Sequence, residues 1–97
     1  MIVSAILHIL NKGPGHTRTQ SCLHTLQAGD TLLLTEHGVT LVMDDASLRQ
    51  LPTDVRLYVN QRDLTARGLA QMVEQRLWVD DARYVELCVQ HTKILSW

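Results

Sequence analysis

The sequence has 97 residues, 45% of them hydrophobic, with 9 Lys and Arg against 10 Asp and Glu and a formal net charge of −1. This length provides for one hydrophobic core, so we expect a single domain over residues 1–97. The basic residues are scattered and form no stripe, which disfavours direct binding of nucleic acid through its phosphates.

The core that this composition provides is small. Aromatic residues make up 4% of the chain and Phe is absent, so Leu, Val and Ile must supply most of the buried volume. Chains of this size often bury a further apolar face against partner subunits, which favours an oligomer.

Cysteine usage and hydropathy indicate a cytoplasmic protein. Cys22 and Cys88 lie far apart with no signal peptide ahead of them, a pattern typical of reduced thiols. Residues 2–10 form an apolar run that is too short to span a bilayer and is followed by no cleavage site. We therefore expect a cytoplasmic location and no membrane segment.

Five apolar stretches are predicted as strands. Their runs are continuous rather than alternating, as in a parallel sheet whose strands are buried on both faces. Turn signals such as Gly13-Pro14-Gly15 and Pro52 separate them. The predicted strands cover residues 2–10, 30–35, 55–59, 77–79 and 94–97.

Helices are predicted between these strands. Thr17 or Thr19 would cap the first, which carries Cys22 and is stopped by Gly29. Residues 36–46 fit both a helical face and an alternating strand, and we favour a short helix.

Two further helical segments follow. Asp63 would cap a short turn over residues 64–67, and Asp80 or Asp81 would open the last helix. The inner face of that helix would carry Tyr84, Val85, Leu87 and Cys88.

Strands that alternate with helices across short loops imply right-handed βαβ units. The predicted fold class is therefore α/β: a three-layer α/β/α arrangement around a mainly parallel five-stranded sheet.

In open α/β sheets, ligands bind at the carboxyl ends of the strands. Residues 11–15, 36–38, 60–63 and 80–81 would lie at that edge. The Gly13-Pro14-Gly15 loop has neither the Rossmann nor the P-loop glycine pattern, so it is interpreted as a plain turn and no cofactor is expected.

Cys22 is the candidate reactive residue, and two interpretations stay open. Near the start of a helix, the backbone N–H groups and the dipole would favour a thiolate. Free cysteine is also among the most buried residue types, so Cys22 can equally be a small core residue. Cys88, on the expected inner face of the last helix, is interpreted as core.

The five histidines suggest no metal site, because no pair has the spacing that preorganises one. Cys88 and His91 lie three residues apart, but further ligands are missing. His8, near the end of an apolar strand, is expected to be a hydrogen-bonded core residue.

Four stretches, in order along nearly the whole chain, carry a family resemblance. They are L-H-I-L-N-K-G-P at 7–14, G-D-T-L-L-L at 29–34 running into Gly38-Val39, L-Y-V at 57–59 with D-L-T-A-R-G at 63–68, and Y-V-E-L at 84–87 leading to Trp97. With these motifs the chain resembles the TusB/DsrH family of sulfur-relay subunits.

The resemblance implies a DsrE-like fold and a heterohexamer with two homologous DsrE-like subunits as partners. In such assemblies sulfur travels as a persulfide between cysteines, towards 2-thiouridine at the tRNA wobble position or within bacterial sulfur oxidation. The main sulfur-accepting cysteine belongs to another subunit. The resemblance therefore implies a non-catalytic accessory subunit of a sulfurtransferase complex.

The resemblance also bears on Cys22. Tus-type members typically lack a cysteine in the first helix, whereas the Dsr-type branch carries one after a serine, and Ser21-Cys22-Leu23 is similar to that branch. An attacking thiolate must reach the outer sulfur of a persulfide, so this role requires an accessible cysteine with a low pKa.

Three functions are thus open. The leading one is an accessory subunit for tRNA wobble-uridine thiolation. The first alternative is a Dsr-type subunit in sulfur oxidation with Cys22 as persulfide carrier. The second is a small-ligand binding module that uses the strand-end loops.

Overall fold

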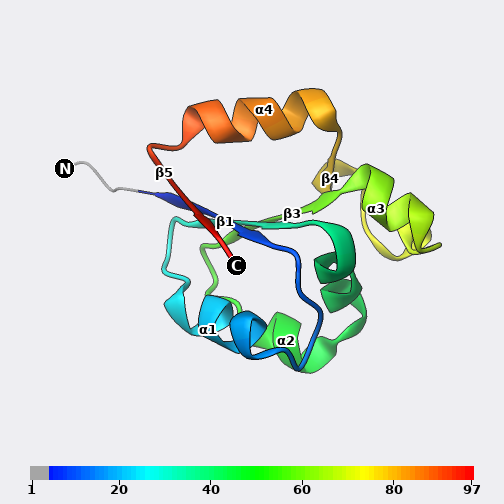
Figure 1. The fold of residues 1–97 in the computed structure, drawn as a ribbon, viewed down its shortest axis with the longest axis horizontal. Helices are drawn as coiled ribbons and strands as arrows, with labels where there is room; N and C mark the ends of the chain where they lie inside the picture. Colours follow the sequence, from blue (N-terminus) through cyan, green and yellow to red (C-terminus); the bar gives the residue numbers. More distant parts are fainter. Residues whose placement is uncertain (1–4) are drawn as a thin grey trace.

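The chain forms a sheet of five parallel strands with helices on both faces, as Figure 1 shows for a computed structural model that describes residues 5–97. The strand order is β4-β3-β2-β1-β5, and each neighbouring pair is parallel. The predicted three-layer α/β/α class is therefore confirmed. The strands are β1 (Ile6–Leu10), β2 (Thr31–Leu34), β3 (Arg56–Asn60), β4 (Trp78–Val79) and β5 (Lys93–Ser96).

All five strands coincide with predicted stretches, with ends shifted by a few residues. Residues 2–4 of the first prediction lie outside the described residues. Every residue of the central strand β2 is buried, which explains its run of three leucines after Thr31.

The helices separate onto the two faces of the sheet. In Figure 1, α1 and α2 lie below it, α4 lies above it, and α3 lies beside β4. The α-helices are α1 (Thr17–Thr25), α2 (Asp45–Arg49), α3 (Gln61–Ala66) and α4 (Asp81–Gln90), and the 3-10 helices are η1 (Glu36–Met43), η2 (Ala70–Met72) and η3 (Gln75–Leu77).

The hydrophobic core has two parts of unequal size. The larger contains Cys22 and Leu23 of α1, Val39 and Leu41 of η1, and the side chains that the strands turn towards them. The smaller joins Leu87 of α4 to strand residues of the opposite face. Because α4 is the main element that packs on that second face of the sheet, the hydrophobic core on that face is small.

Three details of the helices differ from the sequence-based expectation. His16, not Thr17 or Thr19, caps α1: its imidazole accepts the N–H of Arg18, while the hydroxyl of Thr19 donates to the carbonyl of Gly13 at 2.7 Å. The helix ends at Thr25, before Gly29. Residues 36–46 were expected to form one short helix and instead form a 3-10 helix followed by α2.

For α3 and α4, one predicted cap is wrong, one is confirmed, and one residue lies on a different face than predicted. Asn60, not Asp63, caps α3, since its side chain accepts the N–H of Asp63 at 3.0 Å. Asp80 caps α4 as predicted. Val85 is 60% exposed and was wrongly placed on the inner face of α4.

Gly38 lets two segments approach closely at the end of the central strands. The Leu10 carbonyl accepts the N–H of Thr35 at 3.0 Å. A Cβ atom at Gly38 would lie 2.2 Å from that same carbonyl oxygen. Only glycine therefore fits where the chain leaves β2 and crosses the end of β1.

Replacing Gly38 by Ala should lower the free energy of unfolding by about 3 kcal/mol, because the new methyl group meets backbone that cannot move aside. Urea unfolding would measure this. Gly68→Ala is the matched control: its Cβ meets open space, and only its φ of 68° opposes the change. We expect that variant to lose about 1 kcal/mol. Equal losses in the two variants would contradict the steric explanation.

Candidate functional site

The loops that follow β1 and β2 meet at the carboxyl edge of the sheet. The hydroxyl of Thr19 donates to the carbonyls of Gly13 at 2.7 Å and of Lys12 at 3.2 Å, which fixes the loop after β1. A Cβ atom at Gly13 would lie 2.7 Å from Cδ2 of His37, so the two residues are in close contact. The loop thus packs directly on the start of η1.

Glu36 carries the backbone strain of this edge. Its φ is 50°, and among the described residues it is the one non-glycine residue in the left-handed region. Its N–H donates to Oδ2 of Asp63 at 2.6 Å, and Asn60 in turn holds the N–H of Asp63. Asp63 therefore ties the end of β2 to the start of α3 instead of capping a helix. Arg67 donates to the carbonyl of Asp63 at 3.5 Å.

An open cleft of about 480 Å³ lies where β3 and β4 end. Arg62 reaches across it to Asp81, with 2.6 Å between Nη2 and Oδ1, and both side chains are largely exposed. An ion pair so exposed stabilises little. The lining residues are Asn60, Gln61, Arg62, Thr65, Ala66, Val79, Asp80 and Asp81.

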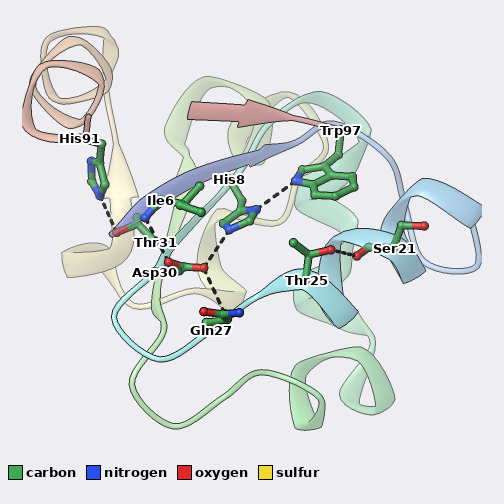
Figure 2. A network of polar contacts seen from close by, with 9 residues as sticks. All are labelled: Ile6, His8, Ser21, Thr25, Gln27, Asp30, Thr31, His91 and Trp97. Carbon is green, nitrogen blue, oxygen red and sulfur yellow. Dashed lines mark hydrogen bonds and ion pairs between the residues drawn. The ribbon is translucent and has the colours of Figure 1, made fainter. Parts of the chain in front are cut away.

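A buried polar network joins β1, β2 and the end of the chain, as Figure 2 shows. Oδ2 of Asp30 lies 3.0 Å from Nε2 of His8 and accepts the N–H of Gln27, while Oδ1 accepts the N–H of Ile6. The indole N–H of Trp97 donates to Nδ1 of His8 at 3.1 Å. His8 is fully buried and hydrogen-bonded, as the sequence predicted.

The partners of His8 define its tautomer. Nδ1 accepts from Trp97, so the ring proton sits on Nε2 and is donated to the Asp30 carboxylate. The two rings also stack, with 6.1 Å between centroids and an angle of 16°. Both nitrogens are occupied, so His8 is a structural link and not a general base.

The environment of Asp30 changes its pKa. Burial of the carboxyl raises the pKa, but hydrogen bonds from Ile6, Gln27 and His8 outweigh this and hold it below the ordinary value of 3.8. Asp30 was predicted only as the first residue of a strand. Its pairing with His8, 22 residues away, was not foreseen.

Cys22 lies inside the larger core with 0% of its surface exposed. Burial raises the pKa of its thiol to about 12, so the thiolate is scarce at neutral pH. In this conformation the residue has the properties of the small core side chain that was one of its two interpretations. Its role as a persulfide carrier stays a prediction, and it would require α1 to move.

Cys88 and His91 do not form the start of a metal site. Cys88 packs, half-buried, against the smaller core. The nitrogens of His91 lie 2.7 Å from the carbonyl of Leu87 and 3.0 Å from the hydroxyl of Thr31. Within residues 5–97, no three His, Cys, Asp or Glu side chains are grouped so that they could hold a metal ion.

Comparison with known proteins decides the family. The family described as DsrH like protein matches residues 12–94. The chain belongs to the DsrH family. Protein TusB of Escherichia fergusonii is 37% identical in an alignment that covers 95% of this chain and 100% of the relative. Protein TusB of Shigella flexneri is 35% identical with the same coverage. The TusB/DsrH resemblance seen in the motifs is thereby confirmed.

A solved structure supports the fold of this DsrH-family chain. The solution structure of protein Tm0979 from Thermotoga maritima aligns with a TM-score of 0.61 at 18% identity, covering 88% of this chain and 92% of the other. At that identity the likeness concerns the fold alone. No helix within residues 5–97 combines the length and apolar character needed to cross a membrane.

Asp30→Asn should cost about 2 kcal/mol of stability at pH 7, because charge-assisted hydrogen bonds to buried groups are lost. The folded pKa of Asp30 lies below its unfolded value, so its contribution is present above about pH 4 and disappears as the pH falls through the folded pKa. Urea unfolding of both proteins at several pH values should show their difference shrinking below pH 4. A difference that is constant with pH would contradict this assignment.

Alkylation of the native chain should modify Cys88 first and leave Cys22 unmodified until the chain is unfolded, because only Cys88 has exposed surface. Peptide mapping by mass spectrometry before and after addition of urea distinguishes the two thiols. Fast modification of Cys22 in the native chain would show that α1 opens readily.

Cys22→Ser should lower the free energy of unfolding by about 1–3 kcal/mol, since it buries a hydroxyl in an apolar site.

Proposed function

We propose that this chain is an accessory subunit of a cytoplasmic persulfide-relay complex that serves 2-thiolation of the tRNA wobble uridine. Its partners would be two homologous DsrE-like subunits in a heterohexamer. The observation that carries the proposal is the match to TusB proteins at 35–37% identity over their full length. The chain would contribute assembly, not chemistry.

Burial of Cys22 supports an accessory role. Sulfur transfer between cysteines needs a thiolate that can reach the outer sulfur of a persulfide. Cys22 has no exposed surface and a pKa of about 12, so it meets neither requirement in this conformation. Sulfur would therefore pass through cysteines of the other subunits.

Exposed apolar side chains support a subunit role. Val85 and Val89 lie one turn apart on α4, and Ile94 lies on β5 just beyond the end of that helix. All three are large hydrophobic residues with substantial exposure. Such side chains on a small domain are consistent with surface that sister subunits cover.

A Dsr-type carrier is the second candidate, favoured by Ser21-Cys22 in α1. It would require local opening of that helix to expose the thiol. Thr25 holds the last turn by donating from its hydroxyl to the carbonyl of Ser21 at 2.7 Å (Figure 2). Cys22 reactivity therefore separates the two candidates.

The test is to co-express the chain with the two DsrE-like homologues of its own genome in a bacterium that lacks this subunit. The three should co-purify, and tRNA hydrolysates should regain 2-thiouridine by mass spectrometry. Cys22→Ala should support both as well as the wild type does, because no step uses its sulfur.

Two results would change this assignment. A chain that stays monomeric beside its homologues would remove the subunit role. A Cys22→Ala variant that assembles but gives no thiolation, together with an added sulfur atom on Cys22 after exposure to a persulfide donor, would establish the carrier role instead.

A further inference from the structure

Half of the outer edge of β3 has no strand partner among residues 5–97. β2 pairs with β3 from Arg56 to Val59, whereas β4 pairs with β3 only at Val59 and Asn60. The N–H of Arg56 donates towards β2, to the carbonyl of Asp30 at 3.0 Å. Because successive residues of a strand direct their backbone groups to opposite sides, the N–H and carbonyl of Leu57 face the open edge.

A groove of about 420 Å³ runs along this edge. The groove exists because the chain before β4 forms the 3-10 helix η3, so that it pairs with β3 only from Trp78 onward. Three of the residues that line it, Val55, Leu57 and Leu77, are apolar and half-buried. The described residues that line it are Val55, Arg56, Leu57, Tyr58, Arg76 and Leu77.

The charged side chains that line the groove are positive. Among the described residues that line it, Arg56 and Arg76 are the charged ones and none is a carboxylate. Arg76 has one acidic partner: its Nε lies 2.6 Å from Oε2 of Glu74, with side chains 73% and 70% exposed. Such an exposed pair contributes little, so another carboxylate can replace Glu74.

Two other occupants fit less well. A second copy of this chain would bring its own arginines against Arg56 and Arg76, and like charges repel. A nucleic acid base would need a free aromatic face, but the guanidinium of Arg83 already lies 5.5 Å from the centre of the Tyr58 ring.

We propose that this groove binds an extended, acidic peptide segment of a partner protein, which adds a strand to the outer edge of β3 in line with β4. The backbone of the segment pairs with Leu57, its carboxylates face Arg56 and Arg76, and its apolar residues contact Leu57 and Leu77. This site is separate from the carboxyl edge of the sheet and goes beyond the proposed subunit role.

The probe for the test is a fluorescein-labelled peptide in which Glu and Val alternate, titrated with the full chain and followed by anisotropy. It should bind saturably, and the same peptide with Lys in place of Glu should not. Arg56→Glu and Arg76→Glu should each weaken binding about tenfold, because each replaces attraction by repulsion. Arg49→Glu, at an exposed site on α2, is the matched control and should leave binding unchanged.

Glu74→Gln should change the affinity for the acidic peptide in the opposite direction. It frees Arg76 from its own carboxylate, so the acidic peptide should bind a few-fold more tightly. A variant that merely disturbed the fold would not strengthen binding, and this result therefore distinguishes a direct role of Arg76 from a structural one.

Backbone pairing is tested with the peptide itself and with Leu57. N-methylation of alternate peptide residues should abolish binding in one register and spare it in the other, because only one set of N–H groups faces β3. Hydrogen exchange at the Leu57 amide should slow on binding, whereas that of Val59, already in the ladder with β4, should change little. Absence of binding, or binding insensitive to N-methylation, would overturn the proposal.

Discussion

The carboxylate of Asp30 joins parts of the chain that are far apart in the sequence. It accepts the N–H groups of Ile6 and Gln27 and the Nε2–H of His8, and His8 in turn holds Trp97. The first two strands and the last are thereby connected through one fully buried imidazole. A charge in such a place is stabilising only when all its partners are present, so the network requires that β1, β2 and β5 be in register together.

The packing of the first helix explains why Cys22 is inaccessible in this conformation. Helix α1 packs its inner face, including Cys22, on the same side of the sheet to which His8 and Trp97 contribute. A thiol in that position has apolar neighbours, and desolvation raises its pKa. An accessible thiolate would require a break in the larger of the two cores. The burial of Cys22 is therefore an argument for the proposed supporting role over a sulfur-carrying one.

The strands could be predicted from the sequence because continuous apolar runs such as Thr31–Leu34 are typical of buried parallel strands. The helix predicted over residues 36–46 had the wrong type and bounds, because the 3-10 helix at residues 36–43 has about three residues per turn and matches neither the α-helical nor the strand period. Caps were ambiguous where several polar residues stand together, as at His16 and Thr17.

The candidate site was predictable only in outline. Its location at the carboxyl edge follows from topology. The contacts that shape it join residues far apart in sequence, such as Glu36 with Asp63, 27 residues apart, and no local pattern encodes such pairs. The burial of Cys22 likewise depends on tertiary packing, which the Ser-Cys motif does not reveal.

The position of β5 has a consequence for biosynthesis. This strand pairs with β1, so the first strand formed must wait for a neighbour from the other end of the chain. On the ribosome, the sheet stays incomplete until residues 93–97 have left the exit tunnel. Until then one side of β1 is an open edge, and His8 lacks its indole partner. Unpaired strand edges favour aggregation, so this stage is the one at which the nascent chain is most exposed to it.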